Sequence, residues 1–354
     1  MKYNLVAAML LAASPLMAQV NPDALKIVGG GAMGKKTIVP KIESLAFPQV
    51  TILYKTATTR EMFKNERGAL GGRKHGGGSV AGRVTSYLDI TDVELTQEDY
   101  QQLTNGFYTY LLAACNKEGI KTVDWATVAS QDFYKDQEDK KEEEKMQQES
   151  QRRGQVYTTV NAYEGNTLLN YDPTKTMNLG FAFGRAKKAS RFSDDLKADL
   201  AIVHLVVDFA DIKMDGDVKT SQYTRSLAPF VYRITKTRDF SFNSTVEENV
   251  KVLGGTAWDG KPIGGRIFFY NEKMQTDQIL FDSDISADVK FATNVTQDPT
   301  KKVLNKKENI FAKDFNAVPV VVSTTKSAYI SAVKKALENF ADSFVKKIQA
   351  SRKG

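Results

Sequence analysis

The most apolar run after the first nineteen residues lies at 198–212 and reads ADLAIVHLVVDFADI. Read with a period of two, it is apolar on one face, and apolar on the other apart from one histidine and a closing aspartate. The first face carries Ala201, Val203, Leu205, Val207 and Phe209, and the second carries Leu200, Ile202, His204, Val206 and Asp208. Such a strand is typical of the centre of a sheet with a packed layer on each side. Its β-branched residues, and the Asp215-Gly216 pair interpreted as a turn, favour a strand over a helix.

Shorter runs of the same kind predict further strands. They lie at 50–58, within 155–183, and at 229–236, 266–270, 278–282 and 318–322. The runs at 266–270 and 278–282 are close enough to form a hairpin. The aspartates in 211–217 have the spacing of a calcium loop, but Lys213 and Gln222 stand where that loop needs an oxygen ligand and a glutamate. We therefore interpret this stretch as a turn.

Two amphipathic helices are predicted, one after residue 95 and one at the end of the chain. Thr96 and Asp99 have the spacing of a capping box, and Gly119 is placed to end the first helix. Its apolar stripe consists of Tyr100, Leu103, Phe107, Tyr110 and Ala114; that of the terminal helix consists of Ile330, Val333, Leu337, Phe340, Phe344 and Ile348. Both stripes are expected to pack in the core, the terminal one against the sheet.

A third helix is predicted at 136–153, where Met146 is the one apolar residue. Without an apolar seam this segment does not form a coiled coil. Charge pairs four residues apart, such as Asp136 with Lys140, support a solvated helix. We expect it to project from the body.

These elements define the expected fold and its organisation. The chain has 354 residues, of which 42% are apolar and 26% charged, as in ordinary globular proteins. We predict an α/β (or α+β) fold: a mixed sheet around the strand at 198–212, covered by amphipathic helices, with the charged helix at 136–153 projecting. The expected organisation is a signal peptide at 1–19, an N-terminal segment with a glycine-rich basic loop at 20–95, and an α/β domain at 96–350.

The first nineteen residues, MKYNLVAAMLLAASPLMAQ, have the pattern of a secretory leader. Lys2 precedes a short apolar core, Ser14-Pro15 breaks it, and Ala18 provides a small residue for cleavage before Gln19. We therefore expect export to the periplasm or the cell exterior. No cysteine stands near the cleavage site, so a lipoprotein is not expected, and no later run is long and apolar enough for a transmembrane span.

The net charge of +7, or +6 once Lys2 is removed with the leader, is mildly basic. A glycine-rich stretch at 67–83 concentrates part of that charge in Arg67, Arg73, Lys74 and Arg83. These four residues are the candidate ligand-binding residues, because arginine forks and free amides on a glycine backbone grip anions. Their expected ligands are anionic envelope glycans or lipid head groups, and nucleic acid is not expected. The alternative is an unstructured insertion with no ligand.

No coherent catalytic or metal-binding pattern is found. Ser323 and Lys326 match S-x-x-K, but the accompanying motifs of penicillin-recognising enzymes are missing. The stretch 29–37 approaches a phosphate loop, with Lys36 in place of the hydroxyl residue. His75 and His204 are the two histidines, and the single Cys115 lies on a helical pattern that predicts a buried thiol. No cofactor or metal is expected, and a hydrolase that uses carboxylates remains the enzymatic alternative.

Over 96–348, the order of the predicted elements and their pattern of apolar and polar residues resemble those of the CsgG-like and TolB-amino-domain-like bacterial envelope proteins. The resemblance rests on GIKTVD after the first helix, on ADLAIVHLVV, on the hairpin GRIFFYNEKMQTDQILFDSDIS and on the terminal AVKKALENFADSFVKKI. It implies a non-catalytic α/β domain that assembles or docks at the envelope, with protein partners or through self-association. The chain departs from the family in lacking a lipidated cysteine and in having the glycine-rich and charged insertions. No functional residue carries over.

Overall fold

The computed structural model describes residues 20–30, 36–65, 79–135, 154–169, 179–228, 231–256, 263–304 and 312–353. The segment 1–19, the stretch 66–78 of the glycine-rich loop and the charged segment 136–153 lie outside these residues. The described residues form a 13-stranded mixed sheet with helices packed on it, which confirms the predicted α/β class.

One continuous path of hydrogen-bonded neighbours organises the sheet. In order it contains β1 (Leu25–Gly29), β9 (Thr276–Phe281), β8 (Arg266–Tyr270), β6 (Asp199–Ala228), β2 (Ser44–Asn65), β3 (Ser79–Ile90), β13 (Val320–Thr324) and β11 (Asn294–Gln297). Off this path, β4 (Lys121–Thr122) and β5 (Val156–Asn161) pair with β2, β12 (Ala312–Asn316) with β3, β7 (Val231–Val252) with β6, and β10 (Ile285–Ser286) with β7. Strands from 20–95 alternate with strands from 96–350, so the two segments build one sheet.

The strand predicted to be central is β6, and both of its faces are covered. It lies between β8 and β2, antiparallel to the first and parallel to the second. Ala201, Val203 and Leu205 are buried in the larger core, together with residues of α1 (Gln97–Lys117) and α6 (Lys326–Lys353). Leu200 and Ile202 are buried in a second core on the opposite face. The reading of this run with a period of two is therefore confirmed.

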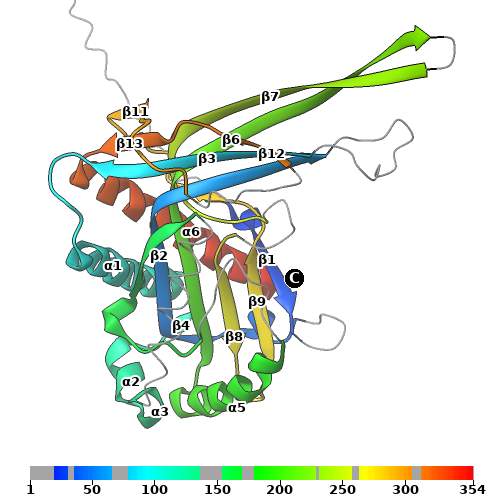
Figure 1. Ribbon diagram of the computed structural model, residues 1–354. Helices are drawn as coiled ribbons and strands as arrows, with labels where there is room; N and C mark the ends of the chain where they lie inside the picture. The colour runs from blue at the N-terminus through cyan, green and yellow to red at the C-terminus, as the bar shows by residue number, and fades with distance from the viewer. Residues whose placement is uncertain are drawn as a thin grey trace, which may run out of the picture.

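The helices α1 and α6 lie beside each other on one face of the sheet (Figure 1). The predicted capping box starts α1: the Thr96 hydroxyl accepts a hydrogen bond from Asp99 N, and the Asp99 carboxylate accepts one from Thr96 N. Gly119 follows the helix with a φ of +75°, a conformation that glycine adopts without a Cβ clash. The phenyl rings of Phe107 and Phe340 join the two helices at 6.2 Å between centroids.

The opposite face is covered by α5 (Leu179–Leu196), with α2 (Trp125–Ser130) and α3 (Asp132–Lys135) nearby. The strand expected towards residue 183 is wrong, because that stretch opens α5. Ala189, Phe192 and Leu196 recur at helical spacing and are buried against Phe268 of β8. That helical stripe lies just beyond the apolar run read as a strand. Three short 3-10 turns, η1 (Pro22–Ala24), η3 (Val39–Lys41) and η4 (Ala162–Glu164), complete the described helices.

The turn predicted at Asp215-Gly216 is also wrong. β6 runs straight through this pair, with Asp215 opposite Asn243 and Gly216 opposite Phe242 of β7. A continuous ladder with β7 satisfies the backbone groups that a local turn would otherwise have used. β6 ends at Ala228, immediately before Pro229, a residue that has no N–H to donate to a ladder.

Two long hairpins result, β2–β3 and β6–β7, and both extend from the body towards the same side (Figure 1). We call the part of β6–β7 beyond Asp208 arm B, and the part of β2–β3 beyond Ala57 arm A. The predicted hairpin β8–β9 is confirmed, and the run at 318–322 corresponds to β13.

Candidate functional site

Both arms leave the body at the same level, which we call the neck. The last paired residues of β2 and β6 are Tyr54 and Val207. From Ala57 onwards β2 pairs with β3, while β6 pairs with β7. The register shifts between Lys55 and Ala57 in β2, against β5, and between Asp208 and Ala210 in β6, against β7. Such bulges bend a strand and increase its twist, so each arm is redirected as it leaves the sheet.

A buried ion pair joins the two strands at the neck. Lys55 Nζ lies 2.9 Å from Asp208 Oδ2, with side-chain exposures of 4% and 6%. Asp208 Oδ1 accepts a second hydrogen bond, of 2.9 Å, from Phe209 N. Because charges buried this deeply are tolerated only when they are paired, each of the two residues needs the other.

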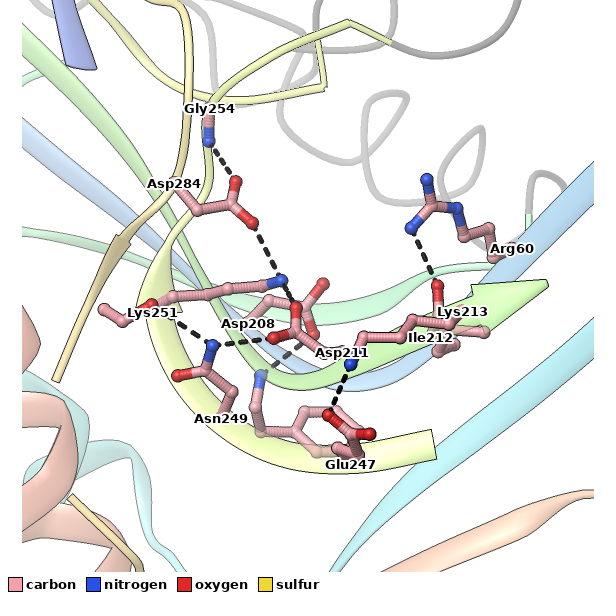
Figure 2. A network of polar contacts seen from close by, with 12 residues as sticks. Arg60, Asp208, Asp211, Ile212, Lys213, Glu247, Asn249, Lys251, Gly254 and Asp284 are labelled. Atoms are coloured by element: carbon pink, nitrogen blue, oxygen red, sulfur yellow. Dashed lines mark hydrogen bonds and ion pairs between the residues drawn. The ribbon is translucent and has the colours of Figure 1, made fainter. Parts of the chain in front are cut away.

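A second cation, Lys251 of β7, lies between two carboxylates at the base of arm B (Figure 2). Lys251 Nζ contacts Asp211 Oδ1, and it lies 2.8 Å from Asp284 Oδ2. Asp284 also accepts a 2.8 Å hydrogen bond from Gly254 N. Asn249 donates to Asp211 Oδ2 at 2.7 Å and to Ser286 Oγ at 3.1 Å. This network fixes the base of arm B to the segment around β10.

Beyond the neck, the two arms also contact each other. Arg60 of β2 donates from Nη1 to the carbonyl oxygen of Ile212 of β6 at 2.7 Å. A Cβ atom at Gly82 of β3 would overlap the ring of Phe242 of β7, so the glycine permits this close approach. Arms A and B are therefore packed against each other at these two points.

Of the four residues predicted to bind ligand, the structure describes one, Arg83. Arg83 lies in β3, is 2% exposed, and its Nε is 2.8 Å from Glu61 Oε1 across the β2–β3 ladder. Arg67, Arg73 and Lys74 lie outside the described residues. Their position in the chain is nevertheless informative, because Asn65 pairs with Ser79, and the segment 66–78 connects these two residues at the far end of arm A.

The residues considered for catalysis from the sequence are Ser323, Lys326, Cys115 and His204. Ser323 and Lys326 do not interact with each other but with carboxylates of other elements. Ser323 Oγ donates to Asp89 Oδ2 at 3.2 Å, while Lys326 Nζ pairs with Asp99 Oδ2 at 2.6 Å. Burial raises the pKa of the Cys115 thiol to about 12 and lowers the pKa of the His204 imidazole to about 3. The thiol is therefore held in its protonated form and the imidazole in its neutral form at physiological pH.

The amides next to the phosphate-loop-like stretch already bind a carboxylate. Asp277 is fully buried, and Oδ2 accepts hydrogen bonds from Thr37 N at 3.0 Å, Ile38 N at 2.8 Å and Val39 N at 3.0 Å. This carboxylate occupies the position at which a bound anion would meet these amides. The contacts attach the N-terminal segment to β9.

Asp199, at the start of β6, provides a test of pH dependence. Burial, followed by the charges of Glu272 and Asp277, raises the pKa of its carboxyl from 3.8 to about 6. The folded state therefore binds this proton more tightly than the unfolded state does. The resulting penalty on stability is absent below pH 3.8 and complete above about pH 6.

Asp199→Asn is accordingly expected to raise the free energy of unfolding at pH 7.5, by at most about 3 kcal/mol. The gain should disappear as the pH falls through 6 towards 3.8, and urea unfolding at a series of pH values measures it. A gain that is equal at pH 4 and pH 7.5 would contradict this assignment.

The neck residues were missed by reasoning from sequence. A lysine inside the apolar strand at 50–58 and an aspartate ending the run at 198–212 were the available signals, but only the β2–β6 register brings them together. Among the described residues, no group of three or more His, Cys, Asp or Glu has metal-binding geometry, and no helix is apolar and long enough to cross a membrane. No protein-family model, curated protein or solved structure matches the chain.

Proposed function

We propose that this chain is an exported bacterial envelope protein with a non-catalytic assembly or binding role, performed by arms A and B. The observation that carries the proposal is the extension of both arms from one neck, towards one side of a body whose sheet is covered by helices (Figure 1). In the described residues, β6 beyond Asp208 has a ladder with β7 alone. A hairpin that extends beyond the sheet of the body is better explained by contact with other molecules than by the folding of the body.

The neck supports this proposal because it fixes the arms to the body. Two bulges, the buried Lys55–Asp208 pair and the Lys251 network lie where the arms begin. Ion pairs buried at a cost in desolvation are a means of specifying one geometry. Arms held in one direction present a defined surface to a partner.

The sequence of both arms favours an anionic partner. Arg67, Arg73 and Lys74 belong to the connection at the end of arm A. The segment 217–241 of arm B has five lysines and arginines against two aspartates. We therefore propose anionic envelope glycans or lipid head groups as the ligands, in accord with the expected export to the periplasm or cell surface.

Replacing Arg67, Arg73 and Lys74 together with serine is expected to abolish most retention on anionic polysaccharide or anionic lipid vesicles. Binding by the parent chain should vanish well below about 1 M salt, because dissolved ions screen the attraction between the cations and an anionic ligand. Arg83 is left in place because its burial against Glu61 makes it structural.

The matched control replaces three exposed lysines of the body, Lys117, Lys121 and Lys187, and removes the same charge. It should keep its retention. Equal retention of the two triple variants would refute the arm A contact. Turnover of a glycan or peptide substrate by the parent chain would refute the non-catalytic role.

A further inference from the structure

The strand β11 (Asn294–Gln297) ends the path of the sheet and is exposed. All four of its residues are exposed, and in the described part of the chain its ladder is with β13 alone. Val295 is 37% exposed, and further exposed valines occur in the loops beside β11 and β13: Val93, Val289 and Val318. The unpaired N–H and C=O groups of an exposed edge strand are a template for pairing with another chain.

The phase of the β11–β13 ladder shows which backbone groups of β11 are directed outwards. Asp298 N donates to Pro319 O at 2.8 Å. Hydrogen-bonded pairs alternate along an antiparallel ladder, so Asn294 and Thr296 direct their N–H and C=O groups towards β13. Val295 and Gln297 direct theirs to the outer edge of the sheet.

We propose that this edge pairs with β11 of a second copy of this chain, antiparallel, about a two-fold axis at Thr296. In this register Val295 lies opposite Gln297 of the second copy, and Gln297 opposite Val295 of the second copy. It is the one antiparallel register that gives partners to both outward residues of each strand. Self-complementarity of this kind is what a two-fold interface requires.

The side chains brought together in this register are compatible. Thr296 faces Thr296 of the second copy, a favourable cross-strand pair, and Asn294 faces Asp298 of the second copy, an amide opposite a carboxylate. Asp298 is the one charged residue in 294–298, so no like charges oppose each other. Pro299 follows and lacks the N–H that a longer ladder would use.

This contact is separate from the ligand contact proposed for the end of arm A. β13 pairs with Ser86–Ile90 of β3, whereas the far end of arm A is the pairing of Asn65 with Ser79. β11 therefore lies at the end of β3 away from the tip of arm A. Pairing through β11 therefore leaves the tip of arm A free.

Disulfide trapping provides the test. In the proposed register, Thr296→Cys places two thiols at a non-hydrogen-bonded pair, with Cα atoms about 4.5 Å apart, within the range of a disulfide. The native Cys115 is buried, so the parent chain provides a baseline. Under mild oxidation T296C should form a covalent dimer as its main product, detected by non-reducing electrophoresis and intact mass.

The matched control is Asn294→Cys, whose symmetry mate lies four residues away along the ladder, about 13 Å. It should give at least tenfold less dimer. Val295→Pro in the T296C background should also reduce the dimer at least tenfold, because it removes an outward N–H that β13 does not use. Its circular dichroism and melting temperature should be unchanged.

Dimer yields from T296C that do not exceed those from N294C would overturn the proposal, as would trapping that survives Val295→Pro. If the Val295→Pro variant loses the circular dichroism spectrum of the parent chain, the dimer yields of T296C and N294C decide whether the proposal holds. Retention by arm A is measured separately, so that either proposal fails without the other.

Discussion

Phe340→Asp is expected to lower the free energy of unfolding by about 3–5 kcal/mol. Phe340 is fully buried on α6, and its ring contacts those of Phe107, Phe281 and Phe344. The substitution removes an aromatic side chain that joins α1, β9 and α6, and buries a carboxylate without a partner. Urea unfolding followed by circular dichroism measures the loss.

Ser331→Asp is the control for this substitution, because Ser331 is exposed on the same helix. Its effect should stay within about 0.5 kcal/mol of the parent chain. An unchanged melting temperature for F340D would show that α6 is not docked on the sheet as described.

Breaking the buried pair at the neck is expected to have an effect of similar size. Lys55→Met leaves the Asp208 carboxylate buried and unpaired, and Asp208→Asn does the same to the Lys55 ammonium. Each single substitution should cost about 3–5 kcal/mol. The double variant should cost at least about 2 kcal/mol less than the sum, because neither charge is then left alone.

The exposed pair Lys213–Glu247 at the base of arm B is the matched comparison, with side-chain exposures of 65% and 58%. Lys213→Met should cost no more than about 1 kcal/mol, since water screens exposed charges. Additive effects in the Lys55 and Asp208 cycle would show that the pair does not hold the neck together.

The elements that sequence predicts well are those whose burial follows a simple period. The run at 198–212 has two apolar faces and becomes the covered strand β6, and Thr96 with Asp99 starts α1 as their spacing predicts. The failures occur where distant pairing overrides local signals. Asp215-Gly216 has the composition of a turn, yet its partners in β7 keep it in a strand.

The ion pair at the neck could not be predicted from the sequence, because it too depends on pairing between distant strands. Lys55 and Asp208 are 153 residues apart. Lys55 is the one charged residue in the run at 50–58, and Asp208 is one of three aspartates in the run at 198–212. Neither has a neighbour in sequence that indicates a partner. The parallel register of β2 with β6 is what places them together, and a register between strands separated by a long crossover is not encoded in any one stretch.

The continuity of β2 and β6 from the body into the arms determines how the molecule bears load. A force applied to either arm passes along an unbroken backbone into the parallel ladder from Leu45 and Asp199 to Tyr54 and Val207. Because that force runs along the strands, it loads the hydrogen bonds of the ladder in shear, where many must break together instead of one after another. The body therefore anchors its arms through the most resistant direction of its own sheet.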